Sequence, residues 1–141
     1  DADAQAIAVY LRALPQRAIA PAEVVKPSAA TLERGAKVYE QHCAQCHGDN
    51  GEGKPGAFPA LAGNRAVVLQ DPTNLVRVVL QGGYLPATAG NPRPHGMPPF
   101  MQVLGDDDVA AVSTFVRNAW GNQAPAVGTI GVYRARERRG S

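Results

Sequence analysis

The chain has 141 residues, a formal net charge of +2 and 45% hydrophobic residues. This balance excludes wholesale disorder and the strongly basic face of a nucleic-acid-binding protein. Aromatic residues make up only 6% of the chain, which also holds 15 glycines and 12 prolines, so either the domain is marginally stable or something other than side chains fills its centre.

Residues 1–14 predict an amphipathic helix with acidic residues in its first turn, where the helix dipole favours negative charge. The pattern of residues 106–119 predicts a second such helix. The two helices share a consecutive aromatic, aliphatic and basic residue. This triplet is Tyr10, Leu11 and Arg12 in the first helix, and Phe115, Val116 and Arg117 in the second. We therefore expect residues 1–14 to be the final helix of a preceding, homologous domain, and the chain to be the last unit of a tandem array cut from a longer protein. The three prolines of residues 15–27 favour an extended linker between the two domains.

The next part of the chain predicts three helices. Ser28 is a suitable N-cap for a helix that runs to about His42. A short helix is expected over residues 66–70. An acidic cap followed by proline at residues 71–72 begins another helix, which stops at Gly82.

The C-terminal part predicts one more helix and a tail. Asp106 is expected to cap the last helix, with Asp107 and Asp108 left in solvent. Residues 124–141 are expected to form a C-terminal extension that ends in a solvated basic tail. No apolar run approaches the ~20 residues that a membrane span needs.

Long loops separate the expected helices. Residues 48–63 and 83–105 are rich in glycine or proline and carry no helical pattern. No segment alternates convincingly as a strand, so the sequence predicts an all-α fold. Loops of this length in a compact domain are usually functional.

Cys43, Cys46 and His47 form a C-x-x-C-H sequence, the attachment signature of c-type haem. Two thiols at this spacing can each form a thioether with one haem vinyl group, and His47 then supplies the proximal nitrogen ligand of the iron. A zinc site would need a second pair of ligands, and the chain has no third cysteine. A thioredoxin-type pair would need a βαβ context, and a structural disulfide would leave His47 unexplained. We therefore predict one covalent haem c, with Cys43 and Cys46 as its thioethers.

The sixth iron ligand has several candidates: Met97, Met101, His42, His95 or an open position. His42 adjoins Cys43 on the proximal side, and Met101 stands just before the last helix, where a core position is expected. His95 is the serious rival, two residues from Met97. The prolines after Met97 stiffen the backbone next to its thioether, and His/Met ligation is standard in cytochromes c, so we predict Met97 as the second axial ligand.

Further residues fit one known pattern around this motif: Gly35, Tyr39, Cys43–Gly48, Phe58, Pro59, Leu61, Gly63, Asn64, Met97–Phe100 and Phe115–Asn122. With them, residues 28–123 resemble a class I cytochrome c domain. The resemblance implies a fold of three to five helices, whose long loops surround one covalent haem and whose first and last helices cross at Gly35. It also implies that the carbonyl of Pro59 accepts a hydrogen bond from His47. The remaining haem-pocket residues that it implies are Leu61, Tyr39 and Phe100.

Residues 81–83, the Met97 loop and the ending Arg117–Asn122 resemble, more narrowly, the cytochrome subunits of bacterial membrane-bound alcohol, aldehyde and gluconate dehydrogenases. Those subunits carry three haem c domains in tandem, so the resemblance implies that this chain is the third, C-terminal domain. The implied partners are neighbouring cytochrome c domains of the same chain, and a dehydrogenase subunit or a respiratory electron acceptor. Haem attachment after export then implies a periplasmic location.

The function expected from these residues is one-electron transfer through the haem, without catalysis on a substrate. Two alternatives stay open. One is a haem domain whose open or labile sixth site binds a small molecule or performs catalysis. The other is the cytochrome extension of another fused oxidoreductase. No nucleic-acid partner is expected.

Overall fold

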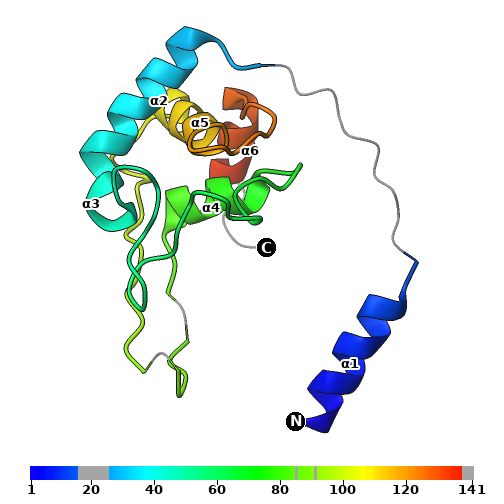
Figure 1. Ribbon diagram of the computed structural model, residues 1–141. Helices are drawn as coiled ribbons and strands as arrows, with labels where there is room; N and C mark the ends of the chain where they lie inside the picture. Colours follow the sequence, from blue (N-terminus) through cyan, green and yellow to red (C-terminus); the bar gives the residue numbers. More distant parts are fainter. Residues whose placement is uncertain (16–25, 85, 91, 138–141) are drawn as a thin grey trace.

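The described part of the chain is helical. The computed structural model describes residues 1–15, 26–84, 86–90 and 92–137. These residues form six helices: α1 (Ala2–Ala13), α2 (Ala29–His42), α3 (Ala44–His47), α4 (Thr73–Gln81), α5 (Asp106–Val116) and α6 (Thr129–Glu137) (Figure 1). Apart from isolated bridges, the described residues contain no β-structure, so the all-α prediction is confirmed, and α2 to α5 fall within residues 28–123. No helix in the described ranges is long and apolar enough to span a bilayer.

α2 and α5 cross at Gly35 (Figure 1). Ser28 begins α2 as expected, since its Oγ accepts a hydrogen bond from the backbone N–H of Thr31 at 3.1 Å. A Cβ atom at Gly35 would overlap the carbonyl oxygen of Ala111 and lie 2.6 Å from the Cβ of Phe115. Only glycine therefore lets the two helices approach this closely, and the crossing implied by the resemblance is present.

α4 packs against both α5 and α6. It begins at Thr73, its N-cap is Pro72 and no side chain caps it, so the prediction of an acidic cap with proline at the first helical position is wrong by one residue. Oδ1 of Asp71 instead accepts hydrogen bonds from the backbone N–H and the hydroxyl of Thr73 at 2.9 and 2.6 Å, just before the helix. Val76 and Leu80 on α4, together with Val132 on α6, are at most 2% exposed. These two helices thereby contribute buried residues to the apolar core that α5 shares.

Residues 129–137 correct the expectation of a solvated tail, because they form α6. Val132 and Ala135 are buried in the core, and the side chain of Arg136 is only 23% exposed. Two buried positions three residues apart are too short a pattern to reveal a packed helix in the sequence. The rest of the basic tail, residues 138–141, lies outside the described residues.

The start of α5 also differs from expectation. Its N-cap is Gly105 and no side chain caps it, so the prediction that Asp106 is the cap is wrong. Of the next two acids, which are predicted to be solvated, Asp107 is 65% exposed and Asp108 only 31%. Each acid hydrogen-bonds to a residue of another helix: Arg136 for Asp106 at 2.7 Å, Thr129 for Asp107 at 3.1 Å and Arg34 for Asp108 at 2.8 Å. The acidic turn thereby ties α5 to α2 and α6.

Residues 66–70 form a turn instead of the expected short helix. The carbonyl oxygens of Val67 and Leu69 each accept a hydrogen bond from the guanidinium of Arg117 at 2.8 Å. In a helix of five residues these carbonyls would have no intrahelical partner, and here a distant side chain pairs with them and holds the segment as a turn.

α1 forms as the sequence predicts, but it packs against none of the other described helices (Figure 1). None of its residues is buried, and the side chains of Ile7, Tyr10 and Leu11 are 60%, 65% and 55% exposed. Most of the expected linker, residues 16–25, lies outside the described residues. An amphipathic helix with this much apolar surface lacks a partner within the described chain.

Candidate haem-binding site

The C-x-x-C-H residues lie where α2 passes into α3. The backbone N–H of Cys43 donates to the carbonyl of Tyr39 at 2.8 Å and ends α2, and α3 then carries Cys46 and His47. Both cysteines are free, so no disulfide joins them. Burial raises the pKa of the Cys43 thiol to about 11, with Cys46 adding in the same direction. Before attachment to a cofactor, Cys43 is therefore a neutral thiol at neutral pH.

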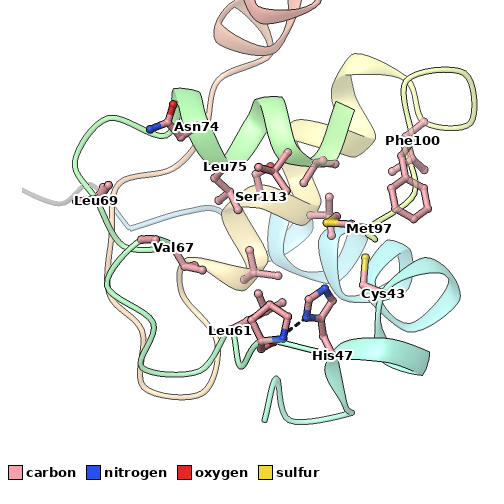
Figure 2. Close-up of a pocket in the computed structure, with 17 residues that line it drawn as sticks. Cys43, His47, Leu61, Val67, Leu69, Asn74, Leu75, Met97, Phe100 and Ser113 are labelled. Atoms are coloured by element: carbon pink, nitrogen blue, oxygen red, sulfur yellow. Dashed lines mark hydrogen bonds between the residues drawn. The ribbon is translucent and has the colours of Figure 1, made fainter. Parts of the chain in front are cut away.

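The ring of His47 is buried and borders a cavity (Figure 2). Its Nδ1 lies 2.9 Å from the carbonyl oxygen of Pro59. A carbonyl oxygen only accepts hydrogen bonds, so Nδ1 carries a proton and donates it; in the neutral ring, Nε2 is then the nitrogen that can bind a metal. This is the contact that the resemblance implies for Pro59.

The cavity consists of two adjoining compartments of about 240 and 270 Å³. Leu61 lines the first compartment and Cys46 the second. The walls are mostly apolar side chains. Both compartments share Cys43, His47, Pro59, Val78, Met97 and Phe100.

Tyr39 is the one predicted pocket residue that lines neither compartment. Its ring packs between helices, 5.5 Å from the ring of Phe115 and 4.9 Å from that of Trp120. Its hydroxyl donates a 2.6 Å hydrogen bond to the carbonyl of Gly48, the residue after His47. Tyr39 thus stabilises the turn after His47 through its hydroxyl, while its ring packs in the helix interface and not on the cavity wall.

Met97 reaches the same cavity from the loop before α5. Its backbone exchanges two hydrogen bonds with Gly83, of 2.8 Å from its N–H and 3.1 Å to its carbonyl. Gly82 has a φ of 71°, and a Cβ atom there would overlap the carbonyl oxygen of Met97. The loop is therefore fixed to the end of α4 at the residue whose thioether enters the cavity. Figure 2 shows the side chains of Met97 and His47 directed into this common space.

The other candidate ligands are placed differently. Met101 lines neither compartment and packs against the core. His42 borders the second compartment, with its ring 5.9 Å from that of Phe100. His95 borders it too, but is exposed and lies 5.0 Å from the ring of Phe58. Of these three residues, only the histidines have access to the cavity.

Sequence comparison identifies the family. The family model for cytochrome c matches residues 32–120. The chain belongs to the cytochrome c family.

Relatives of this cytochrome c include subunits of larger enzymes. The alcohol dehydrogenase (quinone), cytochrome c subunit, of Gluconacetobacter polyoxogenes is 38% identical over 141 aligned residues, which cover 92% of this chain and 29% of the relative. The gluconate 2-dehydrogenase cytochrome c subunit of Pantoea cypripedii is 40% identical over 98 residues, or 69% of this chain and 22% of the relative. Cytochrome c-552 of Thermus thermophilus is 38% identical over 91 residues, or 62% of this chain and 69% of the relative. The chain thus spans less than a third of the length of the two dehydrogenase subunits.

The site fits the haem c that cytochromes c carry covalently. Cys43 and Cys46 offer two free sulfur atoms at the attachment spacing, and His47 offers an unprotonated ring nitrogen. The apolar walls suit a large apolar macrocycle, which resolves the shortage of aromatic side chains in the composition. The chain is accordingly a member of the electron-transferring cytochrome c family whose residues fit one covalent haem c.

A buried arginine, Arg117, stabilises the cytochrome c fold, a role that the sequence does not predict. Arg117 is 0% exposed, and its guanidinium also donates to the carbonyl of Pro125 at 3.0 Å. Burial lowers its pKa, and the charge of Asp71 opposes that change. Arg12 occupies the matching position of α1. A basic residue at the same place in two otherwise apolar patterns is the sequence signal that could have indicated the structural role of Arg117.

Asn122 also joins backbone segments that lie far apart in the sequence. Its Oδ1 accepts a hydrogen bond from the backbone N–H of Gly63 at 3.0 Å, and its Nδ2 donates to the carbonyl of Leu61 at 3.0 Å. The same Nδ2 donates to the carbonyl of Val116 at 2.7 Å. Asn122 therefore ties the loop that carries the pocket residue Leu61 to the end of α5.

Proposed function

We propose that this cytochrome c is the C-terminal haem domain of a multihaem subunit, which relays single electrons from a dehydrogenase to the respiratory chain in a bacterial periplasm. The two dehydrogenase subunits support the proposal, because their similarity covers 92% and 69% of this chain. The observation that carries the electron-transfer role is the apolar cavity into which both His47 and Met97 point (Figure 2).

Within this function, we assign Cys43 and Cys46 to the thioethers, and His47 and Met97 to the two axial positions of the iron. When bound, haem c supplies a one-electron couple. The chain's own residues hold both ligands on backbone that hydrogen bonds fix, at Pro59 for His47 and at Gly83 for Met97. Because the cavity walls are mostly apolar and the backbone beside both ligands is fixed, little of the protein should rearrange when the charge changes. Methionine ligation in an apolar pocket favours the reduced state.

The exposed face of α1 supports a preceding cytochrome c domain. In α5, Ala111 and Phe115 meet Gly35 at the helix crossing. The matching positions of α1 hold Ala6 and Tyr10, a small residue and an aromatic one. A helix with glycine at its crossing point, as in α2, would cover this face in the way that α2 covers α5.

The haem content of the full-length subunit tests the multihaem proposal. Mass spectrometry of the intact polypeptide counts covalent haems, because each thioether-bound haem adds its own mass. We expect more than one haem per chain. A single haem per full-length chain would overturn the multihaem assignment.

Absorbance spectra of the holoprotein test the axial ligands. The far-red band that a thioether gives with ferric iron should be present in the unmodified protein and absent in Met97→Ala. His95→Ala is the control and should retain the band. A reduced protein with five-coordinate, high-spin haem that takes up carbon monoxide readily would instead identify a small-molecule site and overturn the relay.

A further inference from the structure

α6 lies beyond the part of the chain that matches the cytochrome c family model, residues 32–120. It is nevertheless integrated into the domain, since Val132 is 0% and Ala135 6% exposed, and it packs against α4 and α5. An added helix that buries apolar residues against two core helices contributes to stability through that burial alone. Arg136, however, forms a more specific set of contacts.

The guanidinium of Arg136 uses each of its three nitrogen atoms on a single short segment. Nε donates to a carboxylate oxygen of Asp106 at 2.7 Å, Nη1 to the carbonyl of Met101 at 2.6 Å, and Nη2 to the carbonyl of Leu104 at 3.0 Å. The Arg136 and Asp106 side chains are only 23% and 24% exposed. Charge-assisted hydrogen bonds in such a setting are stronger than those between neutral groups, and the planar fork of arginine fixes their geometry.

The segment that Arg136 holds is the C-terminal anchor of the Met97 loop. It begins four residues after Met97. Phe100, which precedes this segment, and Leu104, which lies within it, line the cavity. The backbone N–H groups of Phe100 and Met101 donate to the carbonyls of Val79 and Leu80 on α4, each at 3.0 Å. The N-terminal anchor is the pairing with Gly83. Backbone hydrogen bonds thus attach the loop to α4 and to Gly83, and the contacts of Arg136 add an attachment to α6.

We propose that Arg136 is a positioning residue that keeps the sulfur of Met97 on the haem iron by locking residues 101–106. This rests on the proposed ligation by Met97. A thioether stays bound only while its loop stays closed, and such a loop opens more often when one of its attachments is weakened. α6, which lies outside the residues that match the family model, then acts as a clamp on the ligand loop.

Imidazole binding to the ferric holoprotein measures this opening, because imidazole occupies the iron position that the methionine vacates. Arg136→Ala should raise the apparent affinity for imidazole by about tenfold or more, as the loss of charge-assisted hydrogen bonds allows. Arg136→Lys keeps a charge near Asp106 but lacks the fork, and should give an intermediate increase. Arg134→Ala, at an exposed position of the same helix, should leave the affinity unchanged.

The outcomes distinguish failure of the clamp proposal from failure of the proposed ligation by Met97. If Met97→Ala leaves the far-red band in place, the ligand assignment fails. If Met97→Ala removes the band but Arg136→Ala binds imidazole like the unmodified protein, only the clamp fails. Should Arg136→Ala not fold, Asp106→Asn removes the ion pair alone. It should raise imidazole affinity by a smaller factor, at a denaturation midpoint close to that of the unmodified protein. An Asp106→Asn protein that lowers the midpoint while leaving the affinity unchanged would show a purely structural role and overturn the clamp.

Discussion

The backbones of Met97 and Gly83 pair with each other through two hydrogen bonds, 2.8 and 3.1 Å long. This bridge joins the end of α4 to the loop that carries the proposed ligand. It requires the chain to turn sharply at Gly82, where φ is 71° and ψ is −167°, a region open essentially to glycine alone. The position of the thioether therefore depends on a residue that touches neither the cavity nor the cofactor.

Gly82→Ala should disrupt this junction. The new Cβ would overlap the carbonyl of Met97 and lie 2.9 Å from the backbone N of Pro99. Overlap and backbone strain together should lower the free energy of unfolding by about 2–4 kcal/mol and weaken the far-red band. Gly83→Ala is the matched control, since a Cβ there meets nothing within 4 Å. Equal effects of the two variants in denaturant titrations and spectra would contradict this account.

Gly35→Ala should separate α2 from α5. Its Cβ would overlap the carbonyl of Ala111, and neither helix backbone can yield without moving the other. We expect a loss of about 1–3 kcal/mol in the free energy of unfolding, measured by denaturant titration of the holoprotein. The same substitution at Gly131, which lies within α6 with open space around it, should stabilise by about 0.5–1 kcal/mol. The prediction fails if both changes act in the same direction.

The parts of the fold that the sequence could predict depend on local chemistry. The C-x-x-C-H spacing, the Ser28 cap and the end of α4 at Gly82 each involve residues a few positions apart. The helix crossing at Gly35 came from resemblance, because nothing local shows which helix will lie against a given glycine. The prolines that follow Met97 predict it as an axial ligand. The contact that fixes its backbone, however, is the pairing with Gly83, fourteen residues earlier, which no local pattern reveals.

Two of the errors involve a partner distant in sequence. Residues 66–70 have the composition of a helix, but a guanidinium about 50 residues away pairs with two of their carbonyls and holds the segment as a turn. Asp106 has the position of a cap, but an arginine 30 residues away takes its carboxylate. Helix propensities and capping preferences amount to about 1 kcal/mol each, so a buried arginine with several hydrogen bonds readily overrides them.

Arg117→Met should test how much that buried arginine contributes. The change removes the donors to the carbonyls of Val67, Leu69 and Pro125 while retaining much of the side-chain volume. Leaving buried carbonyls unpaired should lower the free energy of unfolding by about 3 kcal/mol or more. Arg134→Met, on the exposed surface of α6, is the control and should change it by less than about 0.5 kcal/mol. Similar midpoints for the two variants in denaturant would show that the carbonyls find other donors.

Tyr39→Phe should change how stability depends on pH in the alkaline range. The hydroxyl of Tyr39 donates to Gly48 at 2.6 Å, and burial, as the largest cause, raises its pKa above the ordinary value of about 10. In the unfolded chain the phenol loses its proton near pH 10, while the folded protein still holds it. The stabilisation is therefore fully present below pH 10 and is lost as the pH rises, by up to about 1.4 kcal/mol per pH unit.

The variant should lack this loss. At pH 7 it should be less stable by about 1 kcal/mol, because the hydrogen bond to Gly48 is gone. Between about pH 10 and 12 the two stability curves should converge, since only the unmodified protein has this phenol to titrate on unfolding. Tyr133→Phe, at a residue 55% exposed on α6, is the control and should leave the slope unchanged. Parallel curves for Tyr39→Phe and the unmodified protein would mean that the hydroxyl ionises as freely in the folded state as in the unfolded one.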